Sequence, residues 1–422
     1  MKKILLVLCA AAALGFAACS NDSDSPSYVP TPAPSPAPSP EPSPSPSPTP
    51  TTSYTITVEE SANGTVTSDK ASAKKGETVT LTIAPNEGFA LVGLTATSGT
   101  HSATVKGSGA TRTFEMLDGK VTVKGTFCAV VTLGEWPQTI KANDVQIDEG
   151  QTKIMGGMTY YKGSDGAWYA KQTEKAHFAE TKYSDGSIAG HDGTTEKYFK
   201  VEPIVWRVVT SDYGGKKLLM SQRVLAPCIY YDTMEDDRGE IHPNNYKESK
   251  VRAYLNGLVY NKSGSDCADF EGKGFLQGAF SAEDQAKIQT VSVDNSSAST
   301  TDYEGTVDEA GDFACDNTED KVFLLSLKEA TNPNYSFAKP GDSTYGNTRV
   351  IIASDFAIAS GVALSLTEQS GGAWLLRSPV KNTTGKAYGF RLCEQSGKIV
   401  ATSISASGSK ASGVVPVICV NP

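Results

Sequence analysis

Every second residue from Pro30 to Pro50 is proline, and this tract limits what the chain can fold into more than any other feature. Only Ser, Ala, Thr and Glu41 stand between the prolines. Proline fixes φ and has no amide hydrogen, so the tract can form neither a helix nor a sheet. We expect a solvated polyproline II rod, which at ~3.1 Å per residue spans roughly 65 Å. Residues 19–53 are therefore predicted to be a disordered stalk.

The residues before the stalk have the pattern of a bacterial export signal. A short basic start, Met1 to Lys3, precedes the run Ile4 to Ala18, which is apolar and too short to span a bilayer comfortably. The run ends Leu-Gly-Phe-Ala-Ala-Cys at Cys19, which resembles a bacterial lipobox although Phe16 stands where leucine is usual. This resemblance implies a signal peptide over residues 1–18 and lipidation of Cys19. Ordinary signal-peptidase cleavage after Ala18 is the alternative.

The expected location is the cell envelope, with the chain anchored by its N-terminal lipid and exposed at the outer-membrane surface. The 422 residues carry 38 basic and 47 acidic side chains, a net charge of −9. An acidic chain is poorly suited to bind nucleic acid or an anionic membrane surface directly. The expected contact with the membrane is therefore the lipid alone.

Residues 54–127 show the pattern of a small all-β domain. Threonine alternates with apolar residues in Tyr54–Val58, Thr78–Ile83 and Val121–Phe127, which is typical of half-buried strands. Tight turns are predicted at Asn63 and Gly64 and at Asp118 and Gly119. The order of these segments resembles a divergent internalin-type β-repeat. That resemblance implies a β-grasp-like spacer without catalytic activity.

Residues 130–422 contain both strand and helix patterns. Strands are predicted at Tyr198–Val209, Lys217–Ser221, Lys321–Leu325 and Trp374–Leu376, the last ending at Pro379, and a hairpin turns at Asp165 and Gly166. Further strands are predicted near the C-terminus. Serines at four positions are predicted to cap helices, one of them amphipathic over Val251–Val259: Ser249, Ser281, Ser326 (with Glu329 in a capping box) and Ser354. The fold class predicted for the whole chain is α+β: the all-β repeat domain followed by a larger α+β domain.

Several segments of this larger domain resemble the domain of unknown function 6273 family. They include Glu202–Val208, Lys217–Ser221, Ser249–Asn256 and Trp374–Pro379, and they place the resemblance over about Leu133 to Val420. Valine stands at Val415, where the family usually has arginine. Trp206, Arg207, Trp374 and Arg377 are predicted to form the buried framework of this domain. A weaker resemblance links it to C-type-lectin-like folds and their formylglycine-generating relatives.

The spacing of the cysteines and the lack of known catalytic motifs argue against an enzyme. Formylglycine-generating chemistry needs two nearby cysteines, but Cys393 and Cys419, the closest pair along this domain, are well separated. Disulfides are the simpler explanation in an exported chain. Cys393 with Cys419 is the candidate pair, Cys267 with Cys315 is another, and spacing alone cannot decide the connectivity. The sequence contains no zinc-protease, nucleophile-elbow or phosphate-loop motif.

One acidic loop raises the question of a metal. Asp232, Glu235, Asp236 and Asp237 crowd together, and clustered carboxylates are the ligands that calcium prefers. The simpler interpretation is a solvated acidic loop, so we expect no cofactor, with calcium as the alternative. The nearby Tyr230 and Tyr246 could stack on sugar rings or fill the core.

These observations favour a non-catalytic, surface-displayed module that binds an extracellular glycan or protein. The alternative is a structural envelope component that makes protein–protein contacts. An exported enzyme of unknown chemistry is the third possibility.

Overall fold

The computed structural model describes residues 52–107, 109–228, 230, 244–260, 268–305, 314–338, 347–364, 371–381, 388–393, 397–403 and 412–422. Residues Thr51–Pro422 form one compact unit. The predicted signal peptide, Cys19, the proline tract and the acidic loop with Asp232, Glu235, Asp236 and Asp237 lie outside the described residues.

The repeat domain consists of a three-stranded sheet and one end of a 13-stranded sheet, and the two share one core. The alternating segments form strands as predicted, and their inward-facing residues Val79, Leu81, Val121 and Val123 are fully buried. Asn63 adopts a positive φ of 66° at the predicted turn. One sheet contains β2 (Gly64–Ser68), β4 (Thr78–Pro85) and β7 (Thr111–Glu115); the other contains β1 (Ser53–Val58), β3 (Ser72–Lys74), β5 (Phe89–Ser98), β6 (His101–Ser102) and the first part of β8 (Val121–Ile140).

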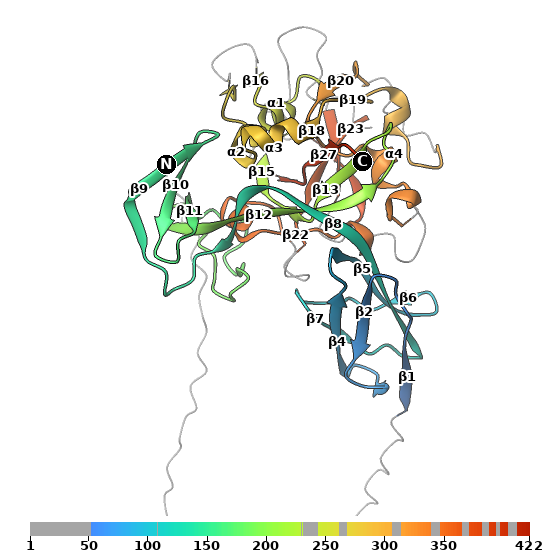
Figure 1. Cartoon of the computed structure of the whole chain (residues 1–422). Coiled ribbons are helices and arrows are strands. Elements are labelled where there is room, and N and C mark those ends of the chain that lie inside the picture. The colour runs from blue at the N-terminus through green and yellow to red at the C-terminus, as the bar shows by residue number, and fades with distance from the viewer. Residues whose placement is uncertain are drawn as a thin grey trace, which may run out of the picture. The chain divides into compact units, whose positions relative to one another are not determined.

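The strand β8 runs through the boundary that the sequence predicted between the two domains (Figure 1). It has 20 residues. Its first half pairs with β1 and β5 of the repeat domain, and its second half pairs with β12 (Glu196–Thr210). The same backbone therefore belongs to the sheets of both domains.

Beyond β12 the large sheet is built from hairpins. The predicted hairpin is confirmed, since β10 pairs with β11 and Gly166 in the turn has a φ of 81°. The predicted pairing of β12 with β13 is also confirmed. The C-terminal strand β27 lies inside the sheet, between β13 on one side and β18 and β21 on the other. The strands are β9 (Ile147–Met155), β10 (Met158–Gly163), β11 (Trp168–Thr173), β13 (Lys217–Ser221), β18 (Ile288–Gln289), β21 (Val322–Phe323) and β27 (Val417–Val420).

A second sheet, of five strands, contains the predicted strand that begins at Trp374. Its strand β23 does not stop at Pro379 as predicted, because a register shift between Leu375 and Pro379 brings Pro379 opposite Phe390 and the strand continues to Lys381. The order is β15 (Ala226–Cys228), β26 (Ser412–Val414), β23 (Trp374–Lys381), β24 (Tyr388–Cys393) and β25 (Ile399–Ser403). Three two-stranded ladders complete the sheets: β14 (Arg223–Val224) with β22 (Ile352–Ala353), β16 (Val259–Tyr260) with β17 (Ala268–Asp269), and β19 (Val291–Val293) with β20 (Thr318–Asp320).

All four predicted helix caps are confirmed. Ser249, Ser281 and Ser354 each accept a hydrogen bond from the backbone three residues later, and Ser326 forms the complete capping box with Glu329. The helices are short: α1 (Lys250–Asn256), α2 (Phe275–Ala279), α3 (Ala282–Lys287), α4 (Leu327–Ala330) and α5 (Asp355–Ala359). Single-turn 3-10 helices occur at η1 (Ser297–Thr300), η3 (Pro333–Tyr335) and η4 (Asn347–Arg349).

The predicted α+β class is wrong, because the described residues are dominated by strands. The longest of their α-helices, α1, has seven residues, whereas β8 has 20 and β12 has 15. The amphipathic pattern suggested a helix through Val259, but Gly257 takes a left-handed φ of 67° and ends α1. Leu258 and Val259 are then 38% and 52% exposed instead of buried on a helix face. The serine caps mark connections between strands rather than a helical layer.

The four predicted framework residues are all buried. The indole nitrogen of Trp206 donates to the Leu133 carbonyl at 2.8 Å, and that of Trp374 donates to the Arg349 carbonyl at 3.1 Å. Arg207 stacks on the Phe337 ring, with its guanidinium carbon 4.6 Å from the ring centroid. Arg377 makes a buried ion pair with Glu329. Each buried polar head therefore has a partner inside the domain.

Candidate functional site

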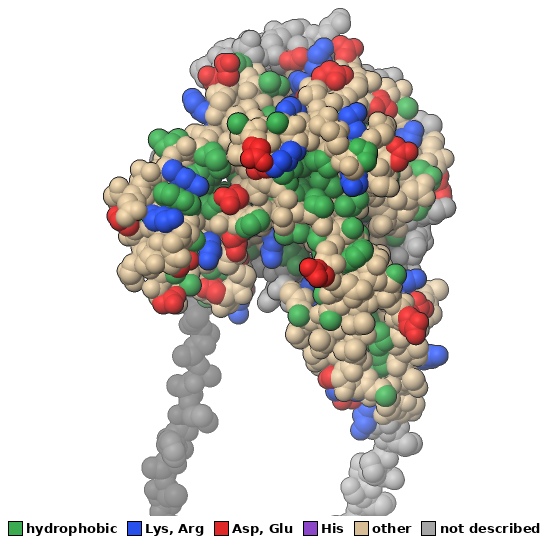
Figure 2. All heavy atoms as spheres, viewed as in Figure 1, with side chains coloured by type: hydrophobic (Ala, Val, Ile, Leu, Met, Phe, Trp, Pro, Cys, Tyr) green, Lys and Arg blue, Asp and Glu red, His purple; other side chains and the backbone are tan. Residues whose placement is uncertain are grey.

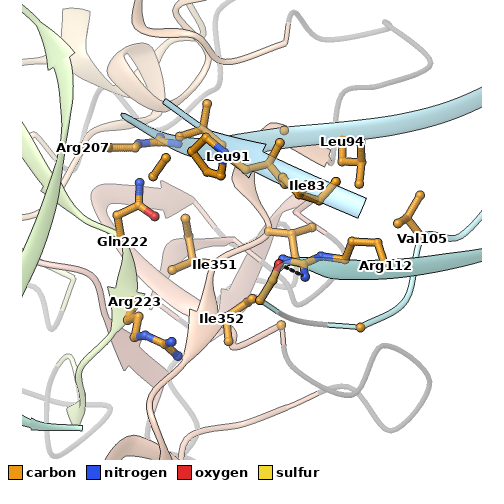
Figure 3. Close-up of a pocket in the computed structure, with 18 of the residues that line it drawn as sticks. Ile83, Leu91, Leu94, Val105, Arg112, Arg207, Gln222, Arg223, Ile351 and Ile352 are labelled. Atoms are coloured by element: carbon orange, nitrogen blue, oxygen red, sulfur yellow. Dashed lines mark hydrogen bonds between the residues drawn. The ribbon is translucent and has the colours of Figure 1, made fainter. Parts of the chain in front are cut away.

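A half-open cavity of about 600 Å³ lies inside the compact unit. One wall comes from the repeat-domain strands β4, β5 and β7 with the segment between β6 and β7, and the other comes from β12, from residues 221–223 and from residues 350–352. We call this feature the interdomain cavity (Figure 3). Its volume lies in the range of ordinary small-molecule sites.

The approach of β5 to η4 shows how closely the two walls meet at one end. A β-carbon placed on Gly93 of β5 would lie 3.6 Å from the Cγ2 atom of Thr348. Because β8 also runs from one set of sheets into the other, the walls are joined by continuous backbone as well as by this contact.

Much of the lining is aliphatic. The strands of the repeat domain contribute side chains that stand at the edge of its core, and residues 350–352 contribute Ile351, which is 5% exposed. The aliphatic side chains labelled in Figure 3 are Ile83, Leu91, Leu94, Val105, Ile351 and Ile352. Such walls favour burial of an apolar body, at about 25 cal/mol for each Å² removed from water.

The charged side chains of the lining are all basic. Lys106, Arg112, Arg207 and Arg223 belong to it, and none of the described lining residues is Asp or Glu. In the chain as a whole, acidic residues outnumber basic ones by 47 to 38. The cavity therefore presents positive charge in an acidic protein, which favours anionic ligands.

Two of these cations have donors to spare. Arg112 donates from Nη1 to the carbonyls of Gly109 and Thr111, and it has no carboxylate partner among the described residues. Burial lowers the pKa of its guanidinium, which stays cationic because arginine titrates so far above neutral pH. The exposed Arg223 guanidinium has no partner in the described part of the chain. Figure 3 shows both side chains reaching toward Ile352 from opposite sides of the view.

Gln222 adds an unsatisfied donor between Arg207 and Arg223. Its Nε2 atom is buried, and within the described structure it has no hydrogen-bond partner. A buried amide nitrogen without a partner costs about 1–3 kcal/mol, so such groups in native proteins usually meet water or a ligand. Gln222 lines the cavity, so a ligand there could accept this bond.

The backbone around Gln222 explains why these side chains reach the cavity. β13 ends at Ser221, whose hydroxyl donates to the Arg223 carbonyl at 2.8 Å and accepts from the Arg223 amide. The Gln222 amide donates to the Val205 carbonyl at 3.0 Å. Arg223 then pairs with Ile352 in the parallel ladder of β14 and β22. This tight turn holds residues 221–223 beside β12 and β22, where they form part of the cavity wall.

Most of the residues predicted for a site either do not line the cavity or are not among the described residues. Of the framework residues only Arg207 lines the cavity. The acidic loop Asp232–Asp237 falls outside the described residues, and those that are described contain no cluster of His, Cys, Asp or Glu able to hold a metal. Tyr230 and Tyr246 are 2% and 1% exposed, so neither is a surface platform for sugars.

The candidate disulfide is not formed in this structure. Cys419 lies in β27 as a buried free thiol, and the Cys393 side chain is outside the description. β24, which contains Cys393, belongs to the five-stranded sheet, whereas β27 belongs to the large sheet. β24 and β27 are therefore not hydrogen-bonded neighbours.

Sequence reasoning missed the cavity residues. Arg112, Gln222, Arg223 and Ile352 are separated by long stretches of chain and share no spacing pattern. The only local signal was the pair Gln222 and Arg223, two polar residues directly after the buried strand Lys217–Ser221.

Comparisons with known proteins identify two domains. The family model of the Divergent InlB B-repeat domain matches residues 54–131. The model of the Domain of unknown function (DUF6273) matches residues 214–422. The predicted resemblances to these two families are thereby confirmed. The second match is shorter than predicted, so β9 to β12 lie in neither match. No curated protein and no solved structure matches the chain.

The pair of domains is typical of a surface-associated module. In the part of the chain that the structure describes, no helix is long and apolar enough to cross a membrane. Hydrophobic side chains gather near β8 on the face shown in Figure 2, and basic and acidic groups are interspersed over the rest of that face.

Proposed function

We propose that this chain is a non-catalytic cell-surface lipoprotein that presents a ligand-binding module on a proline-rich stalk. The observation that carries the binding function is the interdomain cavity, with aliphatic walls and a few converging polar groups, which is the usual composition of small-molecule sites. Support for the display function comes from the sequence: a lipobox-like ending at Cys19 and the rigid tract from Pro30 to Pro50. The expected ligand is extracellular, either a glycan or an exposed part of a protein.

The binding test compares cells that display the full chain, using arrays of glycans and matrix proteins. Val205→Trp is the blocking variant, because Val205 lines the cavity, is 37% exposed, and lies in a strand that tolerates aromatic residues. Val131→Trp is the matched control, since Val131 is 40% exposed on the neighbouring strand and does not belong to the lining.

We expect wild type and Val131→Trp to bind the same array ligand and Val205→Trp to bind it at least tenfold less tightly. Thermal unfolding of both variants checks that each is folded. Equal binding by Val205→Trp would place the ligand outside the cavity. No binding by any form would favour a structural envelope component that contacts neighbouring proteins.

The anchor is tested separately by metabolic labelling with a fatty-acid analogue. Wild type and Cys9→Ala, which changes only the predicted signal peptide, should both incorporate the label. Cys19→Ala should not. Label retained in Cys19→Ala would overturn the lipoprotein assignment without affecting the binding proposal.

A further inference from the structure

The polar groups of the interdomain cavity come from both walls and have the same electrostatic preference. Arg112 projects from β7 of the repeat domain, and Gln222 and Arg223 follow β13 of the C-terminal domain. All three are hydrogen-bond donors with capacity left over, and no carboxylate of the described lining competes for them.

One further basic side chain of the lining, that of Arg207, is buried. Arg207 is 3% exposed, lines the cavity, and is held by stacking on Phe337 and by a contact of Nη2 with the Met220 sulfur at 3.3 Å.

We infer that the cavity binds a small anion with an apolar body, whose charged oxygens pair with the guanidinium groups of Arg112 and Arg223 and with the Gln222 amide. The aliphatic lining around Ile351 and Ile352 accommodates the apolar body. A guanidinium group donates paired hydrogen bonds to carboxylate and to phosphate oxygens alike. The shared chemistry of the ligand is therefore a head group with anionic oxygens on an aliphatic chain. This inference rests on the proposed function, because it names the ligand class of the same cavity.

Because each wall supplies donors, an anion of this kind bridges the two domains. Binding should therefore stabilise the folded chain against unfolding of either domain, in proportion to ligand concentration. A ligand held by one wall alone would stabilise only the domain that supplies that wall.

The test uses isothermal calorimetry and thermal unfolding on the full chain carrying Cys19→Ala, which removes the predicted acylation site and the need for detergent. Four probes that share a ten-carbon chain are compared below their micellar concentrations: decanoate, decyl phosphate, decanol and decyltrimethylammonium. We expect at least one of the two anions to bind at least tenfold more tightly than decanol, and the cation to bind least. The ranking of decanoate against decyl phosphate then shows which head group the site prefers.

Three variants locate the charge. Arg223→Gln and Arg112→Gln should each weaken anion binding by roughly ten- to a hundredfold, the loss expected for a charge-assisted hydrogen bond, and should leave decanol binding unchanged. Lys120→Gln is the matched control, because Lys120 is an exposed cation of the repeat domain outside the lining. It should bind like the parent chain, and raising the ionic strength should weaken anion binding to the parent.

Decanol binding as tightly as both anions, or wild-type affinity in both arginine variants, would overturn the inference. Failure of both anions to bind would overturn it as well. The proposed function would survive these results if an array ligand still depended on Val205, so the two failures are distinguishable.

Discussion

Arg377 in β23 binds Glu329 in α4 through both terminal nitrogens, with Nη1 2.5 Å from Oε2 and Nη2 3.1 Å from Oε1. The two side chains are only 1% and 11% exposed. Tyr213 donates its hydroxyl to the same carboxylate at 2.8 Å, and the Ser326 amide donates at 2.8 Å to complete the capping box. Arg377 also donates to the Leu324 carbonyl. This network ties the tryptophan strand to the start of α4 and leaves neither charge without partners.

Removing one member of this pair should cost much more than removing a surface charge. Arg377→Met leaves the Glu329 carboxylate buried without its cation, so we expect the free energy of unfolding to fall by about 3–5 kcal/mol. The double variant Arg377→Met with Glu329→Gln should recover part of this loss, because no buried charge remains. Chemical denaturation measures both.

Lys75→Gln is the control for this prediction. Lys75 and its partner Asp118 are 68% and 59% exposed, so their ion pair is screened by solvent and its loss should be too small to resolve. A loss in Arg377→Met as small as that of Lys75→Gln would contradict the role given to the buried pair.

The same ion pair should make the stability of the folded chain depend on pH. Burial alone would raise the pKa of Glu329, but the charge of Arg377 and the hydrogen bonds from Arg377, Ser326 and Tyr213 outweigh it and hold the pKa below the usual 4.5. A carboxyl whose pKa is lower in the folded state stabilises the protein above its unfolded pKa. That contribution is lost as the pH falls below about 4.5 toward the folded pKa.

The Glu329→Gln variant should therefore be less stable than wild type near neutral pH. On acidification it should lose less stability than wild type does. The measurement is the free energy of unfolding of wild type and variant between pH 7 and pH 3, and the two curves should converge at the acid end. Curves that stay parallel over this range would show that Glu329 does not titrate differently in the folded and unfolded states.

A glycine contact in the hairpin of β9 and β10 gives a prediction about packing. Gly156 has a φ of 55°, and a β-carbon there would lie 2.2 Å from the Cα atom of Gly278 in α2. Gly156→Ala adds left-handed strain to a backbone clash, so we expect a loss of about 3 kcal/mol. Gly166→Ala is the matched comparison, because Gly166 has a φ of 81° with nothing within 4 Å. It should cost only about 1–2 kcal/mol, and equal losses would remove the contact with Gly278 as an explanation.

Local chemistry in the sequence predicted the local structure well. The serine caps at Ser249, Ser281 and Ser354 and the capping box at Ser326 depend only on residues three positions away, and all were confirmed. The alternating strands of the repeat domain were found for the same reason. Helix length was not predictable in this way, because Gly257 ended α1 where the apolar pattern continued to Val259.

Features set by distant partners were not predictable. The sequence predicted a domain boundary between residues 127 and 130, but β8 continues through it, and its two halves pair with different strands. The cavity brings together Arg112, Val205, Arg223 and Ile352 through strand pairing across the whole chain. No spacing rule relates such residues, whereas the framework residues Trp374 and Arg377 stood out because a buried strand rarely contains both.

The thiol of Cys419 gives the last prediction. It lies in β27, opposite Leu218 of β13 and Gln289 of β18, and it is fully buried. Burial, with a smaller contribution from the charge of Glu329, raises its pKa to about 12. Alkylating reagents attack the thiolate, so Cys419 should resist iodoacetamide at pH 8 in the native protein and react after denaturation. The half-buried Cys128 of β8 should react sooner.

Peptide mapping without reduction should show no bridge at Cys419, and a linked Cys393–Cys419 peptide would restore the disulfide and require β24 and β27 to approach each other.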